Sequence, residues 1–407
     1  MKRQLTGESE RGAVSLFVVI FTALIVTVMT VSFIRLMIDG QRSASDADLS
    51  RSALDSAQAG VEDAKRALVK YRSCLSGSSD PTTCARLVAT LPTDKSCQVL
   101  QNSGIVGAPA DKEVIIKQSD GDEKLQQAYT CVKVEINSDD YIGTIDQDKS
   151  RIIPLRGVSE FNQIRIKWFT IDDLANPEDR IDLPALPSDP SAGFELPKQA
   201  DWPSNQPALM RAQLIQYGDN FTLDQFDKPE GGDSNSNTLF LYPDQVGAKS
   251  YSFLSDGRRS ASSGLLRSVT CDPNFSKETS ATTGRQYACE TIITLPKAIG
   301  ASSEKQRTAY LNLMGLYRSS NNFKIELLNS SGGVASTPDV VKFGGVQAVV
   351  DSTGRANDKF RRVESRVELD ANTFQYPTST SNTSAGFCKN FFVTDAAAEY
   401  VKGDDDC

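Results

Sequence analysis

The feature that most constrains this chain is an uninterrupted apolar segment close to its N-terminus. Residues Ala13 to Ile34 read AVSLFVVIFTALIVTVMTVSFI and include no charged side chain. As an α-helix, this segment would span about 33 Å, enough to cross a hydrocarbon core about 30 Å thick. Lys2, Arg3 and Arg11 precede it, so the positive-inside rule predicts a cytoplasmic N-terminus with the rest of the chain outside. We therefore predict a single transmembrane helix over residues 13–34.

A cleaved secretory signal peptide is the competing interpretation of this segment. The apolar region of a signal peptide is usually about 7–15 residues long and ends at a small-residue cleavage site. The run from Ala13 to Ile34 is longer than that. Its length therefore favours a retained membrane anchor over simple secretion.

The helical pattern continues beyond the membrane as an amphipathic stretch over residues 35–72. From Gln41 to Arg72 there is no proline, and Gly60 is the single glycine. The small residues recur at steps of four, three and four, at Ala53, Ala57, Gly60 and Ala64. Such a seam lets another backbone approach closely, either a neighbouring helix or the protein's own sheet.

Two short motifs flank the apolar segment and carry a family resemblance. A basic leader ends in Arg11-Gly12, and the run DSAQAGVEDA follows the span at residues 55–64. Over about residues 8–72 the chain resembles type IV pilins, most closely the PilX-type minor pilins. The resemblance implies that a prepilin peptidase removes residues 1–12 by cutting between Gly12 and Ala13. It also implies that the helix rests in membrane lipid and then packs with other pilin subunits in a filament. In a helix of this type the lower half lies on the protein's own sheet, so the resemblance implies that Gly60 lies there and that Ala53, nearer the membrane, faces neighbouring helices.

One position departs from the pattern of the major pilins. They carry a glutamate five residues after the cut, which pairs with the N-terminal ammonium of a neighbouring subunit inside the fibre. Phe17 stands at that position here. The departure argues against a role as the bulk fibre subunit and suits a minor or tip-located one.

Eight cysteines in an exported chain predict disulfide bonds. Cys271 and Cys289 form one candidate pair, and Cys388 and Cys407 form another. Cys74, Cys84, Cys97 and Cys131 can be joined in three ways, of which sequence proximity favours Cys74 with Cys84 and Cys97 with Cys131.

The region after the helix has the alternating pattern of β-strands. We expect strands at 131–136, twice within 152–171, and at 239–242, 288–295, 310–317, 323–328, 346–350 and 360–369. Asp351 to Gly354 has the composition of a turn. The predicted fold class is α+β, a long N-terminal helix followed by an antiparallel, pilin-like β region.

Proline density suggests how this β region is divided. Seven of the 17 prolines lie within residues 176–208, a density that disfavours helix and central strand. We expect this stretch to be a linker between a first disulfide-containing lobe, 73–175, and a second β-rich lobe, 209–378. A disulfide-closed tail, 379–407, would follow.

The composition excludes several classes of catalytic and binding function. The absence of histidine removes imidazole acid–base catalysis and histidine metal ligands, and the net charge of −8 argues against nucleic-acid binding. Asp233 to Asn237 resembles the start of a calcium loop, but Thr238 stands where that loop needs glycine. We therefore expect no enzymatic activity, no cofactor and no bound metal.

Two functions fit these observations. The first is a structural minor-pilin-like subunit of a type IV pilus-like filament, acting in adhesion or pilus assembly. The second is a single-pass membrane-anchored adhesin that forms no filament and whose β region binds a surface or glycan ligand. The mature N-terminus distinguishes them, because a filament subunit would begin at Ala13.

Overall fold

The computed structural model describes most of the chain between residues 11 and 369. The described residues are 11–77, 81–107, 113–116, 126–176, 179–184, 198–216, 236–252, 266–276, 278, 286–300, 309–330 and 339–369. The predicted tail, including Cys388 and Cys407, lies outside them.

A single long helix, α1 (Arg11–Leu75), includes both the predicted membrane span and its amphipathic continuation. The helix is uninterrupted because its 65 residues include no proline and only three glycines, Gly12, Gly40 and Gly60. Two shorter helices follow, α2 (Pro81–Thr90) and α3 (Val99–Asn102). In the described residues, 3₁₀ helices also lie at Ile171–Asp173 and Gln199–Asp201.

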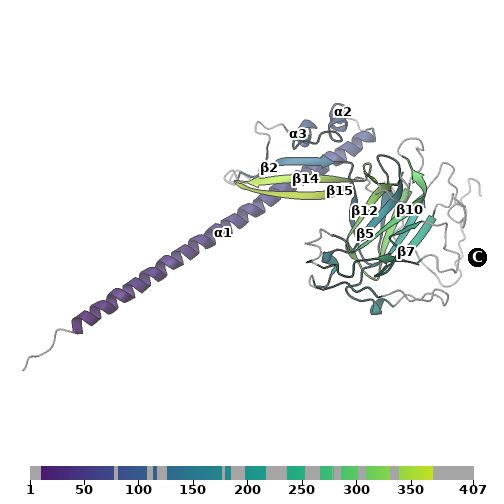
Figure 1. The fold of residues 1–407 in the computed structure, drawn as a ribbon. Coiled ribbons are helices and arrows are strands. Elements are labelled where there is room, and N and C mark those ends of the chain that lie inside the picture. Colours follow the sequence, from purple (N-terminus) through teal and green to yellow (C-terminus); the bar gives the residue numbers. More distant parts are fainter. Residues whose placement is uncertain are drawn as a thin grey trace, which may run out of the picture. The chain divides into compact units, whose positions relative to one another are not determined.

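The second half of α1 packs on a four-stranded antiparallel sheet, here called the helix-packed sheet (Figure 1). Its strands, in spatial order, are β1 (Val114–Ile115), β2 (Ala128–Glu135), β14 (Gln347–Ala356) and β15 (Lys359–Glu368). Apolar residues of the helices and of the inner face of the sheet form one core. They include Val61 and Leu68 of α1, Val132 of β2 and Val350 of β14. Burying that face stabilises the sheet and the second half of the helix together.

Two further sheets pack face to face as a β-sandwich. The first sandwich sheet has the order β13 (Asp339–Val341), β12 (Ser320–Asn329), β5 (Phe161–Trp168), β10 (Cys289–Ile299) and β8 (Ser250–Ser252), with β3 (Tyr141–Ile145) also pairing with β12. The second has the order β4 (Ser150–Leu155), β11 (Ala309–Leu316), β6 (Leu209–Gln216), β7 (Ser236–Asp244) and β9 (Leu266–Thr270). Their inward side chains share one apolar core.

The predicted α+β class is confirmed, with antiparallel pairing throughout except for two parallel pairs of named strands, β8 with β10 and β7 with β9. Each predicted strand coincides with an observed one. Alternation explains this success: in β5, Ile164, Ile166 and Trp168 are fully buried, while the charged residues between them are only partly buried.

The sandwich is an insertion within the helix-packed sheet. β2 and β14 pair with each other, with Val134 opposite Val350, yet strands β3 to β13 lie between them in the sequence. Strands on both sides of residues 176–208 also share sheets, as β5 does with β10 and β12. Parts of that proline-rich stretch join the sandwich core through Ile181 and Leu183. These described parts of the stretch therefore pack on the sandwich, whereas the sequence suggested a boundary between two lobes.

The prediction of a turn at Asp351 to Gly354 is wrong, because these residues lie inside β14 and pair with β15 and β2. The connection between β14 and β15 comes later, at Asn357, whose φ of 50° is a conformation that asparagine tolerates well. Gly354 serves close packing instead, since a Cβ at this position would lie 2.2 Å from the carbonyl oxygen of Ala53 in α1. Such a contact is impossible for any side chain.

Candidate functional site: the two faces of the long helix

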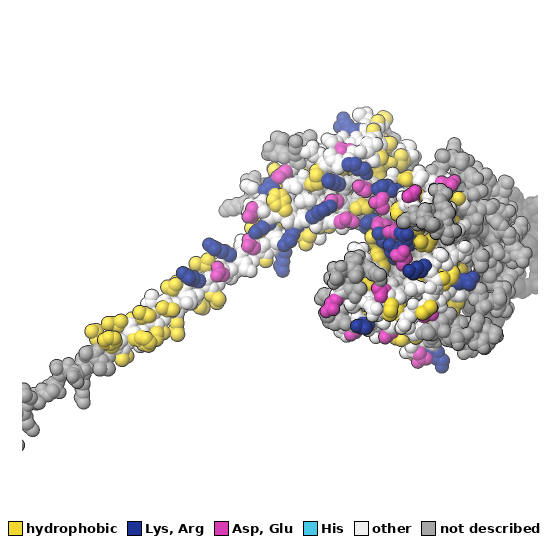
Figure 2. Space-filling model, in the orientation of Figure 1, with side chains coloured by type: hydrophobic (Ala, Val, Ile, Leu, Met, Phe, Trp, Pro, Cys, Tyr) yellow, Lys and Arg dark blue, Asp and Glu magenta, His cyan; other side chains and the backbone are white. Residues whose placement is uncertain are grey.

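The first half of α1 presents large apolar side chains to solvent. Figure 2 shows them as a nearly continuous apolar surface along the part of the helix that extends beyond the sheet. Their exposed fractions run from 43% to 77%, and the residues are Leu16, Phe17, Val18, Val19, Ile20, Phe21, Leu24, Val26, Val28, Met29, Val31, Phe33, Ile34, Leu36, Met37 and Ile38. A continuous apolar surface of this extent marks contact with lipid or with other protein chains.

Hydroxyl side chains in this segment make hydrogen bonds within the helix. Thr22 donates to the carbonyl of Val18 at 2.9 Å, and Thr27 and Thr30 make the same contact four residues back at 2.7 and 2.8 Å. Ser32 does likewise, to Val28. Each hydroxyl therefore has a partner that does not depend on water, which removes most of the cost of placing it in hydrocarbon.

Among the described residues, this is the one helix long and apolar enough to span a membrane. Gly12 and Ala13, the predicted processing residues, lie in its first turn. Phe17, at the position where major pilins carry glutamate, is 77% exposed and adds to the apolar surface. The predicted cleavage itself stays a prediction.

The seam of small residues lies in the second half of α1 and faces the protein's own sheet. Ala53, Ala57 and Ala64 are fully buried. A Cβ on Gly60 would lie 2.4 Å from Ser352 Oγ and 2.9 Å from a methyl carbon of Val132.

Small residues on β14 complete this close approach. Gly354 lies against the backbone of Ala53 and Ala57, so the helix and the strand meet almost backbone to backbone. We expected Ala53 to face neighbouring helices, but the structure buries it against β14. The partners of the seam on β14, Ser352 and Gly354, lie nearly 300 residues away in the sequence and carry no local signal.

Polar contacts fix the helix along the same face. Tyr129 of β2 donates its hydroxyl to Asp63 at 2.8 Å, and burial together with this carboxylate raises the pKa of Tyr129. Nearer the membrane segment, Arg361 contacts Ser50 at 2.6 Å and Lys359 contacts Asp46 at 3.2 Å. These contacts begin at Asp46, which marks the start of the packed half.

Three disulfides join the predicted cysteine pairs that fall within the described residues. Cys74 at the end of α1 bonds to Cys84 of α2, Cys97 bonds to Cys131 of β2, and Cys271 bonds to Cys289 of β10. The first two are the pairs that sequence proximity favoured.

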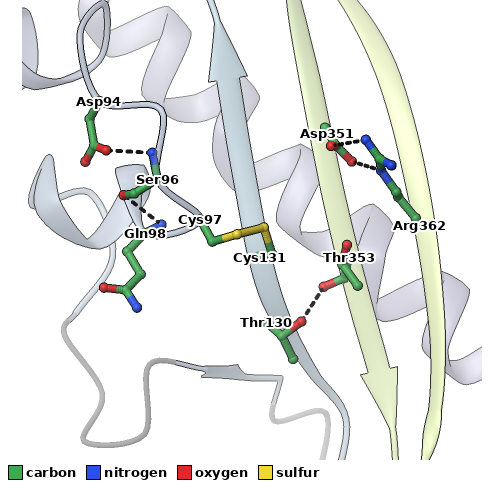
Figure 3. Close-up of a disulfide and its surroundings, with 9 residues drawn as sticks. All are labelled: Asp94, Ser96, Cys97, Gln98, Thr130, Cys131, Asp351, Thr353 and Arg362. Carbon is green, nitrogen blue, oxygen red and sulfur yellow. Dashed lines mark hydrogen bonds and ion pairs between the residues drawn. A yellow bond between two sulfur atoms is a disulfide. The ribbon is translucent and has the colours of Figure 1, made fainter.

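Figure 3 shows how the Cys97–Cys131 bond ties the loop before α3 to β2. The backbone N–H of Val132 donates to the carbonyl of Cys97 at 3.0 Å, which reinforces this attachment. On the outer face of the same sheet, Arg362 donates two hydrogen bonds to Asp351, at 2.6 and 2.5 Å. Both contacts hold the sheet that supports the packed half of α1.

Within the described part of the chain, no group of three or more acidic, cysteine or histidine side chains is placed to hold a metal ion. The candidate calcium loop begins at Asp233, outside the described residues, and residues 236–244 form strand β7.

Comparisons of the chain with family models, curated proteins and solved structures found no match. The architecture itself is pilin-like, because a long N-terminal helix has an apolar first half and packs its second half on an antiparallel sheet. One candidate span and three disulfides are the features of a membrane-anchored protein with an extracytoplasmic domain.

Proposed function

We propose that this protein is a minor-pilin-like structural subunit of a type IV pilus-like filament. Its first helical half rests in the membrane with the N-terminus in the cytoplasm. After a prepilin peptidase cuts between Gly12 and Ala13, that half packs among other pilin subunits. The single observation that carries the proposal is the division of α1 into an exposed apolar half and a half packed on its own sheet.

The division supports assembly because the exposed half has no partner within the described fold. Lipid and the helices of neighbouring subunits both shield its apolar side chains from water. The same surface therefore serves the subunit while it waits in the membrane and after it enters the filament. The packed half keeps the extracytoplasmic domain attached to the helix during that transfer.

The experiment compares the wild-type chain with Gly12→Leu in the native cell. The mature N-terminus is sequenced from membrane extracts and from surface filaments released by shearing. We expect Ala13 as the first residue and the wild-type protein in the sheared fraction, whereas Gly12→Leu stays uncut in the membrane. Uncut wild-type protein that is absent from the sheared fraction would contradict the proposal.

Phe17 favours one alternative, a single-pass membrane-anchored adhesin that forms no filament. Without glutamate at this position, the chain lacks a carboxylate to pair with a neighbouring N-terminus. The same sequencing experiment separates the two functions, because the adhesin would keep its leader and remain with the membrane.

A further inference from the structure

A hollow on the outer face of the first sandwich sheet is a feature that the anchoring role leaves unused. Its volume is about 800 Å³, within the range of ligand-binding sites. The hollow lies beside the outer edge of β10, where the pairing partner of this strand changes from β8 to the segment of Cys271. Ile292 N donates to the carbonyl of Lys249 at 3.0 Å, while three residues earlier Cys289 is bonded to Cys271. The disulfide gives this wall of the hollow a fixed backbone.

Three lysines line the hollow, and two of them are neutralised by the protein. Lys324 Nζ lies 2.7 Å from Asp140 and 3.1 Å from Glu326. Lys167 Nζ lies 3.6 Å from Glu290 and from Glu326. Burial would lower the pKa of Lys324, but its two carboxylate partners outweigh burial and raise it.

Lys249, the third lysine, stands at the exposed rim of the hollow. In the part of the chain that the structure describes, it has no ion-pair partner. It is therefore the cation that a ligand can use without competing against a carboxylate of the protein.

The rest of the lining mixes hydrogen-bonding groups with a small apolar surface. Gln286 offers both a donor and an acceptor, the carboxylates of Asp272 and Glu290 accept, and Tyr287 and Ile292 contribute apolar area. Sugar rings match this mixture, because each hydroxyl donates and accepts while the C–H face of the ring is apolar. An extended peptide would instead need a row of apolar pockets for alternate side chains.

We propose that this hollow binds a carboxylate-bearing saccharide, with Lys249 contacting the carboxylate and Tyr287 lying against the sugar ring. The inference goes beyond the filament role and does not rest on it, because the site belongs to the sandwich. It assigns the sandwich a recognition function while α1 anchors the chain.

The test uses the full-length oxidised protein in detergent micelles and saturation-transfer NMR. The acidic probes are trigalacturonic acid and 3′-sialyllactose, and the neutral counterparts are maltotriose and lactose. We expect saturable binding of at least one acidic probe, roughly tenfold tighter than its neutral counterpart, as one charge-assisted contact provides. Lys249→Gln should remove that preference, and Tyr287→Ala should weaken both acidic and neutral sugars.

Lys95→Gln is the matched control, since Lys95 is an exposed lysine in the loop before α3, and it should bind as the wild type does. Near-ultraviolet circular dichroism of each variant reports whether the fold is kept. The proposal is overturned if neither acidic sugar binds saturably, or if Lys249→Gln binds with unchanged preference. Lys249-dependent binding of a hexaglutamate peptide, without binding of either acidic sugar, would overturn it in favour of an acidic peptide.

Discussion

The two halves of α1 belong to one continuous helix but differ in the size and surroundings of their side chains. Between Leu16 and Ile38 most side chains are large, apolar and exposed, whereas Ala53, Ala57 and Ala64 are small and fully buried. Large side chains suit a surface that meets lipid or other helices, and small ones allow the backbone of β14 to approach. The comparison shows that residue size, rather than helix propensity, divides this helix between partners outside the chain and the chain's own sheet.

Truncation should give the largest difference between the halves. A chain of residues 41–407 keeps every seam residue, so we expect it to melt cooperatively without detergent. A chain of residues 61–407 lacks Ala53, Ala57 and Gly60 and should lose its cooperative transition, because the part of the helix-packed sheet that these residues cover is exposed. Calorimetry of the two oxidised proteins measures this. Equal melting of both would show that the seam contributes little to the fold.

Glycine substitutions sharpen the comparison at single positions. Gly60→Leu should lower the free energy of unfolding by about 3 kcal/mol, because its Cβ alone would overlap Ser352 and Val132. Gly40→Leu is the matched control, since a Cβ at Gly40 meets no atom within 4 Å. Denaturant titration in micelles gives both values. If the two variants were equally stable, the seam would not pack on the sheet.

Charge substitutions should affect the exposed half of α1 more than the packed half, because only the exposed half enters the membrane. Leu24→Asp should weaken membrane insertion by about 2.5–3.5 kcal/mol, the cost of an aspartate near the centre of a spanning helix. Its effect on the melting of the extracytoplasmic domain should be nil, because Leu24 is 58% exposed. Leu54→Asp, on the outward side of the packed half, should leave membrane retention unchanged. Fractionation of cells into membrane and soluble parts distinguishes these outcomes, and retention of Leu24→Asp at wild-type level would count against a membrane span.

The smallest expected effect concerns the hydrogen bond from Tyr129 to Asp63. Tyr129→Phe should cost about 1 kcal/mol at neutral pH. Because the folded state raises the pKa of Tyr129, the wild-type advantage is complete below the usual tyrosine pKa of about 10 and decreases as the pH rises above it. Urea titrations at neutral and alkaline pH measure the difference. A constant difference across pH would mean that the hydroxyl titrates normally.

Local patterns made part of this structure predictable. The apolar run from Ala13 to Ile34 and the proline-free stretch after it were enough to predict α1, and alternation identified strands such as β5 and β15. These signals lie within one element, so they need no knowledge of its partners. β3 and β6 were not predicted, although β6 carries the signal, since Met210, Ala212 and Leu214 alternate with Arg211 and Gln213.

Long-range pairing made the rest unpredictable. No local signal shows that β2 pairs with β14 across the whole sandwich, and the turn-like composition of Asp351 to Gly354 concealed the second half of β14, whose glycine is needed for contact with α1. The same limit applies to the seam. Alanine and glycine suit a neighbouring helix and the protein's own sheet equally well, so only Gly354 and Ser352 on β14 decide the side on which Ala53 lies.

The most direct measurement of the divided helix is photo-crosslinking in native cells. A benzoylphenylalanine residue replaces Phe21 in the exposed half, and crosslinked products are identified by mass spectrometry. The account predicts adducts with lipid and with a second pilin-like subunit. Adducts confined to residues 46–369 of the same chain would contradict it, because the first half of α1 would then pack on its own domain.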